Sequence, residues 1–354
     1  MDNKLYDYSP ITTRPKLTWP NGARLAFYIG LNIEHYEVDN PSTSIFGGTA
    51  MLQPDPLNYG WRDYGVRVGI WRMIEALDKH QMRASVLLNA DCCKHYPQII
   101  EAGKQRKWAW LAHGKNNSMF QTGMDVDTER KFLKEIVGIV SEATGHQIRG
   151  WLGPALTETF ETPRLLRELG LTYVLDGCAD DPPFPLNVPG MMSVPYGIEI
   201  NDVTMLVSRG MTGEHFCQAV IDQFDRLYQE GEMTGRVMAL CLHPFIINQP
   251  FRQKYLEKAL AYIAGHDGVW LTTSDEIAAL RGEPHEMTGA PGEAARVRTD
   301  HTCAIRGRGL AGGVAASDPG CNHALASSEH APSGSPRGPG CQRRYFFAVS
   351  SNAS

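Results

Sequence analysis

The chain has 354 residues, of which 42% are hydrophobic and 21% are charged, as is ordinary for a globular protein. Its 34 basic and 39 acidic side chains give a formal net charge of −5 with both signs mixed, so we expect neither a nucleic-acid partner nor a membrane partner. The longest apolar runs, such as residues 25–31, are far shorter than a membrane span. The polar N-terminus lacks the order of a signal peptide and the eight cysteines form no CxxC pair, which together predict a cytoplasmic protein with reduced thiols.

The last fifth of the chain differs in composition from the rest. Residues 286–354 contain ten Gly, five Pro and seven Arg but no Lys, and they show no period of 2 or 3.6 residues. Such a segment cannot bury enough apolar surface to offset the entropy of ordering it. Although length alone would suggest two or three domains, we expect one catalytic domain over residues 1–285. The tail over 286–354 is then either disordered or not native, in-frame sequence.

Short apolar runs and amphipathic stretches alternate along the rest of the chain. Strands are expected at 24–33, 84–89, 108–112, 148–152, 172–175, 203–207, 237–242 and 269–271. Helices are expected at 62–78, from Pro97 onward, and at 126–143, 163–169, 213–229, 251–264 and 274–281. This alternation predicts an α/β fold with a parallel sheet, either open or closed into a barrel. In such folds the chemistry lies at the carboxyl ends of the strands.

Two glycines are expected where the chain turns sharply. Gly114 permits a tight turn directly after His113 and lets that imidazole turn inward. Gly145 is expected to end the helix at 126–143. The buried face of that helix is expected to carry Phe132, Ile136 and Ile139.

Side chains capable of hydrolytic chemistry follow several of the expected strands. These are Glu34 and His35 after the first strand, Asn89 and Asp91 after the second, His113 with Asn116 and Asn117 after the third, and His243 after a later one. Amide hydrolysis needs one group that takes a proton from water and another that protonates the leaving nitrogen. It also needs a metal or fixed donors that polarise the carbonyl. Each of these side chains alone is compatible with a solvated loop, but their shared position at strand ends favours an active site.

A series of short segments carries a family resemblance. The segments lie at residues 31–36, 61–71, 113–118, 149–154, 162–170, 176–181, 195–202, 242–252 and 269–273. In this order they resemble the polysaccharide deacetylase (NodB-homology) family over roughly residues 17–280. They are most similar to its branch of metal-independent allantoinases and cyclic imide hydrolases. The resemblance implies a distorted (β/α) barrel with about seven parallel strands and, because tetramers occur in the family, a homo-oligomer.

The resemblance assigns roles by position, and the chain departs from the metal-dependent pattern. Glu34 and His35 stand where metal-dependent members have an Asp-Asp pair, of which the first is the general base and the second a metal ligand. His113 and Asn117 occupy the places of a His-xxx-His ligand pair. The histidine that protonates the leaving group is retained as His243.

These departures weaken the case for a metal, because a neutral Asn amide is a poor ligand for zinc. Either no cofactor is required, or His35, His113 and Asn117 bind a divalent metal such as zinc weakly. We therefore hypothesise a hydrolase of a non-peptide C–N bond in a small cyclic amide, imide or ureide. In this hypothesis Glu34 activates water, His113 and Asn117 orient the water or the carbonyl, and His243 protonates the leaving nitrogen.

Further side chains are expected to bind this small-molecule substrate. One segment combines aromatic and charged groups suited to a flat polar ring, through Trp61, Arg62, Tyr64 and Arg67. The same segment is equally compatible with a simple helix start, with Asp63 near its positive end. The resemblance adds Trp151 and Asp181. A set of acidic residues either orients catalytic side chains or only forms turns, namely Asp176, Asp180, Asp181 and Asp202.

Two other functions are compatible with the sequence. One is a metal-dependent N-deacetylase of a polysaccharide or amino sugar, which requires a bound divalent ion. The other is a catalytically silent barrel that binds a ligand or a partner, although the retained Glu34 and His243 speak against it. The adjacent Cys92 and Cys93 are interpreted as ordinary cysteines rather than reactive thiols, because no paired base is visible in the sequence.

Overall fold

A computed structural model describes residues 3–282, which lie within the first of two compact units of the chain, Met1–Thr288. The expected tail at 286–354 lies outside the described residues. The strands are β1 Leu25–Ile33, β2 Ala84–Leu88, β3 Ala109–Ala112, β4 Gly150–Trp151, β5 Tyr173–Val174, β6 Phe184–Pro185, β7 Met192–Ser193, β8 Arg236–Leu242 and β9 Val269–Leu271. The α-helices are α1 Pro56–Tyr64, α2 Ile70–Lys79, α3 Ala90–His95, α4 Pro97–Gln105, α5 Val126–Thr144, α6 Thr162–Glu168, α7 Gly213–Glu230, α8 Pro244–Ile247, α9 Pro250–Ala264 and α10 Ser274–Gly282. Shorter helical turns are η1 Ile11–Thr13, η2 Pro20–Gly22, η3 Gly65–Gly69, η4 Pro154–Leu156 and η5 Val203–Ser208.

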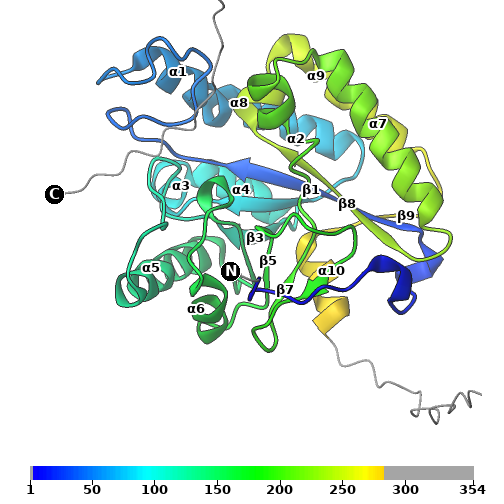
Figure 1. The fold of residues 1–354 in the computed structure, drawn as a ribbon. Helices are drawn as coiled ribbons and strands as arrows, with labels where there is room; N and C mark the ends of the chain where they lie inside the picture. The colour runs from blue at the N-terminus through cyan, green and yellow to red at the C-terminus, as the bar shows by residue number, and fades with distance from the viewer. Residues whose placement is uncertain (1–2, 283–354) are drawn as a thin grey trace, which may run out of the picture. The chain divides into compact units, whose positions relative to one another are not determined.

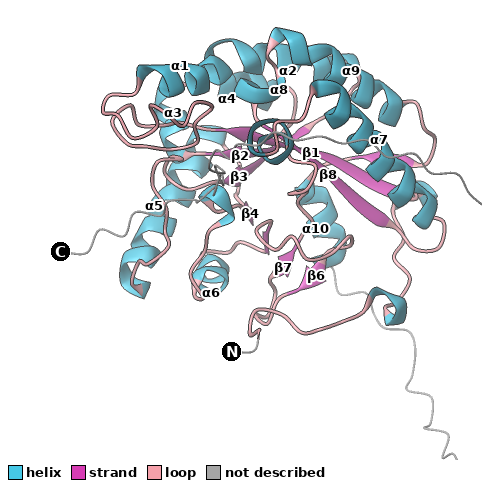
Figure 2. Ribbon diagram, turned by 45° about the horizontal axis from the view of Figure 1, so that its top comes forward, coloured by secondary structure: helices cyan, strands magenta, loops and turns pink. Residues whose placement is uncertain are grey.

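The strands of this described part form one curled sheet, a half-barrel. Its order is β6-β7-β5-β4-β3-β2-β1-β8, and β9 pairs with the start of β1. Every strand pairing is parallel except that between β6 and β7. Most of the long helices cover the outer side of the sheet (Figures 1 and 2). Within residues 3–282, no helix has both the length and the apolar character needed to cross a membrane.

The predicted α/β class is confirmed, with nine strands in this sheet where about seven were expected. The difference includes β6 and β7, which have only two residues each and lie in a Pro-rich stretch without a strand pattern. Such short strands are recognised from their pairing partners rather than from their own sequence. Their pairing extends the sheet beyond β5.

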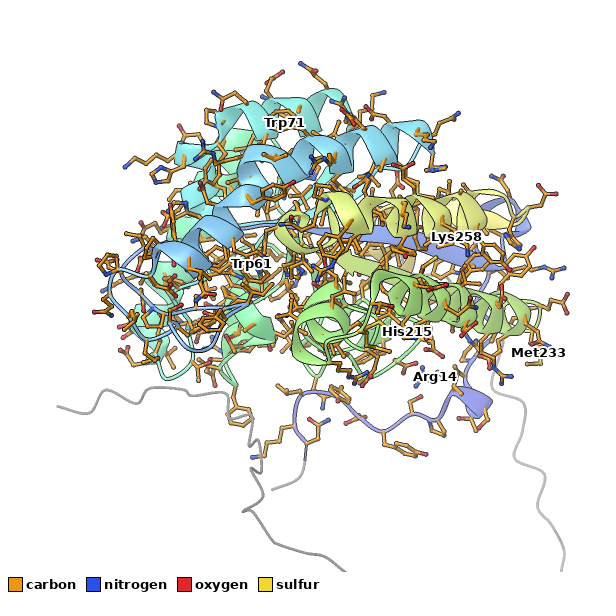
Figure 3. All side chains as sticks on the ribbon, turned by 90° about the horizontal axis from the view of Figure 1, so that it is seen from above. Arg14, Trp61, Trp71, His215, Met233 and Lys258 are labelled. Atoms are coloured by element: carbon orange, nitrogen blue, oxygen red, sulfur yellow. The ribbon has the colours of Figure 1, made fainter. Side chains whose placement is uncertain are left out.

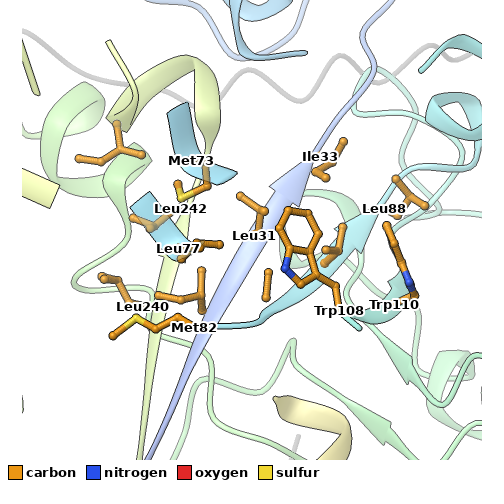
Figure 4. Packing of buried hydrophobic residues seen from close by; sticks show 14 of the residues in the cluster. Leu31, Ile33, Met73, Leu77, Met82, Leu88, Trp108, Trp110, Leu240 and Leu242 are labelled. Carbon is orange, nitrogen blue, oxygen red and sulfur yellow. The ribbon is translucent and has the colours of Figure 1, made fainter. Parts of the chain in front are cut away.

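Successive residues of each strand face opposite sides of the sheet. The outer side of β1 joins a cluster with the helices through Leu25, Phe27, Ile29, Leu31 and Ile33. The inner side joins a second cluster through Ala26 and Tyr28. Figure 4 shows the outer cluster, in which Leu31 lies among Met73 and Leu77 of α2 and Leu242 of β8. Because both faces are covered, β1 is a continuous buried run rather than an alternating one.

The helix expected at 62–78 is longer than predicted. Helical structure extends from Pro56 to Lys79 through α1, the short π-helix η3 and α2. Gly69 in η3 lets this helix approach the chain directly after β8, because a Cβ there would lie 2.2 Å from the carbonyl oxygen of Pro244. The segment that follows β8 therefore packs closely against this helix.

Two local predictions are wrong. Residues 203–207 were expected as a strand but form the helical turn η5, which begins where the side chain of Asn201 accepts a hydrogen bond from the N–H of Val203 at 2.9 Å. The buried face of α5 consists of Leu133, Ile136 and Val140 rather than Phe132, Ile136 and Ile139. Ile139 is 38% exposed, because the buried apolar stripe of α5 is shifted by about one residue from the predicted stripe. Gly145 does end α5, with a left-handed φ of 67°.

Candidate active site

The alternation along the strands brings four polar side chains to the inner face of the sheet. Tyr28 of β1 faces inward, and every second residue after it faces the same side. Glu34, six residues later and just past the end of β1, therefore also faces inward. By the same step, Asn89, His113 and His243 follow inward residues of β2, β3 and β8. Because β3, β2, β1 and β8 are neighbours in this order, these side chains gather at one edge of the sheet.

Glu34 lies at the centre of this group, with its side chain only 3% exposed. Its Oε1 lies 3.3 Å from Nε2 of His113 and 3.6 Å from Nε2 of His243. The same oxygen accepts a hydrogen bond from the side-chain amide of Asn117, and Oε2 accepts one from the hydroxyl of Tyr36. Both carboxylate oxygens therefore face hydrogen-bonding groups in a site nearly closed to water.

Glu34 and His243 form a buried ion pair. Burial alone would raise the pKa of Glu34, but the charge of His243 and hydrogen bonds from His113 and His243 outweigh it and lower this pKa. Burial alone would lower the pKa of His243, whereas Asp202 and Glu34 together raise it to about 10. At neutral pH the site therefore holds a carboxylate that can take a proton beside an imidazolium that can give one.

Asp202 fixes the ring of His243. Its Oδ1 accepts a hydrogen bond from Nδ1 of His243 at 2.7 Å, and its Oδ2 accepts one from the backbone N–H of His243 at 2.8 Å. Asp202 is fully buried and immediately precedes η5. This carboxylate holds Nδ1, so Nε2 is the ring nitrogen left to face Glu34.

The ring of His113 is fixed through the backbone. Its Nδ1 donates to the carbonyl oxygen of Leu152 at 2.7 Å, since a carbonyl can only accept. The turn after His113 is made by Gly114 with a left-handed φ of 65°, and a Cβ there would lie 2.4 Å from Pro154. The expected role of Gly114 in turning the imidazole inward agrees with this geometry. Nε2 of His113 consequently faces Glu34.

The three expected metal ligands do not assemble into a site. Nδ1 of His35 hydrogen-bonds to the hydroxyl of Tyr96 at 2.9 Å, and its ring stacks on His95 with centroids 4.5 Å apart. Asn117 directs its NH₂ group to Glu34, so its oxygen is not the atom that faces the carboxylate. Among residues 3–282, no group of three or more His, Cys, Asp or Glu side chains could hold a metal ion. The donor set does not fit a zinc ion.

Two of the four substrate-binding residues expected on α1 and η3 adjoin this group. Trp61 packs edge-to-face on Phe245, with ring centroids 4.8 Å apart. The guanidinium of Arg62 is buried and lies 4.7 Å from the ring centre of Tyr36, the hydroxyl of which binds Glu34. These contacts connect α1 to the site through Phe245 and Tyr36.

The other two contact residues outside this polar group, and their substrate-binding role stays a prediction. The hydroxyl of Tyr64 is bound by the guanidinium of Arg72. The side chain of Arg67 is 75% exposed and lies 3.5 Å from Asp63. Arg62, by contrast, contacts the ring of Tyr36.

Trp151 and Asp181 are misplaced in the sequence-based prediction. Trp151 belongs to the outer cluster and is fully buried there, because it alternates with the inward-facing Leu152. The carbonyl of Asp181 accepts a hydrogen bond from the N–H of Val237, near the start of β8, whereas His243 follows the end of that strand. Asp181 therefore lies at the opposite end of the sheet.

Two cavities of about 420 and 490 Å³ lie apart from the polar group around Glu34. Both are lined in part by Arg14 and Asp180 near the start of β8. Figure 3 shows Arg14 well separated from Trp61, which adjoins the polar group around Glu34. Neither lining includes Glu34, His113 or His243.

Two contributing residues were not selected from the sequence. Tyr36 lies two positions after Glu34, so the period of two was the signal that places both on one face. For Asp202 the sequence allows either a positioning role or a turn role. No pattern in the sequence shows that Asp202, from a distant segment, contacts His243.

Comparisons with known proteins extend this description. No family model matches the chain. A Schizosaccharomyces pombe protein provisionally named as a polysaccharide deacetylase is 26% identical over 310 residues, which cover 78% of this chain and 95% of that protein. The crystal structure of a probable polysaccharide deacetylase from Pseudomonas aeruginosa PAO1 is 27% identical, with a TM-score of 0.68 over 77% of this chain and 95% of that one. A PuuE allantoinase structure is 25% identical, with a TM-score of 0.70 over 79% of this chain and 99% of that one.

The chain has the NodB-like deacetylase fold, an α/β half-barrel. The chain has polysaccharide deacetylase homologues in both sequence and structure, and an allantoinase is among its structural neighbours. The family resemblance seen in the motifs is thereby confirmed. Deacetylases and allantoinases are hydrolases of non-peptide carbon–nitrogen bonds, so the predicted enzyme class is confirmed as well.

Proposed function

We propose that this chain hydrolyses a small cyclic amide, imide or ureide. The observation that carries the proposal is the enclosed pair of Glu34 and His243, whose side chains are 3% and 9% exposed. A polysaccharide needs an open groove around the reacting carbon, whereas an enclosed site suits a small ligand that becomes almost wholly buried. The allantoinase among the structural neighbours, named for a small cyclic ureide, agrees with this class of substrate.

In the proposed reaction, Glu34 takes a proton from water as the water oxygen attacks the carbonyl carbon. His113, whose ring is held by Leu152 through Nδ1 and lies beside Glu34, helps to orient this water. The C–N bond then breaks as Nε2 of His243 gives its proton to the leaving nitrogen, and the opened ring carries a carboxyl group and an N–H. The proton held by Glu34 returns to His243 across the 3.6 Å that separates the two groups.

This division of roles suits an activated ring. The leaving nitrogen of an imide or ureide is stabilised by a second carbonyl, so less help is needed from a metal that polarises the carbonyl. The poor fit of His35, His113 and Asn117 to zinc agrees with a reaction that needs no metal cofactor.

A second candidate is metal-dependent N-deacetylation of a polysaccharide or amino sugar. The names of the Schizosaccharomyces and Pseudomonas relatives favour it. It would require His35 to leave Tyr96 and enter the site, and Asn117 to turn its oxygen away from Asn89. Both changes give up buried or half-buried hydrogen bonds.

A substrate panel separates the two candidates. We expect the purified chain to hydrolyse at least one of a hydantoin, a succinimide-type imide or allantoin, and to release no acetate from N-acetylated sugars. Turnover is measured by the loss of ring absorbance and by acetate release. Acetate release from the sugars without turnover of any ring would contradict the proposal.

The pH dependence of kcat/KM follows from the raised pKa of His243. Because His243 must be protonated to act as the acid, kcat/KM should stay constant from neutral pH to about pH 9 and fall above about pH 10. Asp202→Asn removes a charge that raises this pKa, so the alkaline limb should move to lower pH. Asp222→Asn, on the exposed side of α7, is the control that should leave the limb in place. An alkaline limb unmoved by Asp202→Asn would contradict the role of His243.

The expected cytoplasmic location and homo-oligomeric state remain part of this proposal. The oligomer is measured directly by light scattering of the full chain, where we expect a mass above that of one 39.2 kDa chain. A small-molecule substrate is the proposed partner.

A further inference from the structure

Asn89 is a fully buried residue that joins three segments of the site. It directly follows β2, and its Oδ1 accepts a hydrogen bond from the backbone N–H of His35 at 2.9 Å. Its Nδ2 donates to the backbone carbonyl of His113 and, at 3.0 Å, to Oδ1 of Asn117. Asn89 touches neither Glu34 nor His243 in any of these hydrogen bonds.

The partners of Asn89 allow its amide one orientation. A backbone N–H can only donate and a backbone carbonyl can only accept, so His35 fixes the position of Oδ1 and His113 fixes that of Nδ2. The second N–H of Asn89 must then meet an acceptor, which is Oδ1 of Asn117.

The orientation of the Asn89 amide fixes that of the Asn117 amide, which contacts Glu34. With its oxygen held by Asn89, Asn117 can present only its NH₂ group to Glu34. The backbone supports the same geometry, because the N–H of Asn117 donates to the carbonyl of His35 at 2.9 Å. Without Asn89, the amide of Asn117 could turn by half a rotation and place its oxygen against the carboxylate, where two acceptors repel.

We propose that Asn89 is a positioning residue, which acts through Asn117 so that an N–H donor rather than a carbonyl oxygen faces Glu34. The proposal rests on the proposed function, in which Glu34 is the base. The donor keeps the carboxylate aimed at the water, and the committed oxygen of Asn117 is unavailable as a metal ligand. Asn89 touches no reacting atom itself.

A double-mutant cycle in kcat tests the proposed path of action. We expect Asn89→Ala and Asn117→Ala each to lower kcat by about 10- to 100-fold with little change in KM. If Asn89 acts through Asn117, the double variant should be no slower than Asn117→Ala alone. Losses that multiply in the double variant would overturn the proposal, because Asn89 would then act by another route.

A matched variant separates positioning from loss of stability. Asn58 is also fully buried, and its amide likewise accepts from a backbone N–H and donates to a backbone carbonyl, both belonging to Phe46. Asn58→Ala should lower Tm by an amount similar to Asn89→Ala while kcat stays within about threefold of the wild type. An equal loss of kcat in both variants would overturn the proposal.

The orientation of Asn117 can also be measured without a substrate, from its side-chain NH₂ resonances in ¹⁵N-labelled protein. Glu34→Gln should shift these resonances in an otherwise wild-type chain, because the NH₂ group donates to Glu34. In an Asn89→Asp background the amide should turn and the shift should vanish. If the shift persists there, Asn89 does not set the orientation. This measurement needs no substrate. If no ring substrate were turned over, only the proposed function would be contradicted, and the orientation of Asn117 could still be tested.

Discussion

Glu34→Gln should lower kcat by about 10²- to 10⁴-fold, the range that a general base contributes. The Gln side chain keeps the size of Glu34 and can still accept a hydrogen bond from Asn117, but it cannot take a proton from water. The expected loss is in kcat more than in KM, and stopped assays on the preferred ring substrate measure it. Circular dichroism should show that the fold is kept.

Glu37→Gln is the matched control for this experiment. Glu37 lies three residues further along the chain and accepts hydrogen bonds from Asn40 at 3.1 Å and Asn116 at 3.0 Å. Its replacement should change kcat by less than about threefold. Activity of Glu34→Gln within tenfold of the wild type would remove Glu34 as the base.

His243→Gln should lower kcat by about 10²- to 10³-fold, because the leaving nitrogen then departs without a proton donor. The size of the loss should depend on the substrate. A nitrogen that is a good leaving group needs little protonation, so the loss should be smallest for the most acidic imide and largest for the least acidic amide. Rates for a series of rings of graded N–H acidity measure this dependence.

His215→Gln serves as the control for the histidine change. His215 is exposed on α7 (Figure 3), and its replacement should leave kcat unchanged. If His243→Gln slows every ring in the series by the same factor, His243 does not protonate the leaving nitrogen.

Most of the fold could be predicted because its signals are local. The buried run of β1 and the periodic pattern of α7 each lie within one stretch of sequence. The turn η5 could not be predicted from the apolar run at 203–207, because its start depends on the side chain of Asn201. The strands β6 and β7 depend on distant partners, and two residues are too few to show a period.

The active site was predictable only in part. Position after a strand selected Glu34, His113 and His243, which the structure does bring together. It could not say which neighbouring residues share a face, so His35 was grouped with Glu34 although its ring nitrogen binds Tyr96. Successive residues face opposite sides of the sheet, so Glu34 and His35 point in different directions. For the same reason Trp151 faces the outer cluster and not the site.

Turnover of a ring substrate by metal-free protein tests the central claim most directly. The full chain is treated with a chelator, the chelator is removed, and the metal content is measured by mass spectrometry before the assay. We expect kcat to stay within about twofold of the untreated protein at less than about 0.1 metal ion per chain, and added Zn²⁺ to give no increase. Loss of activity on chelation, restored by Zn²⁺, would contradict hydrolysis by Glu34 and His243 without a metal.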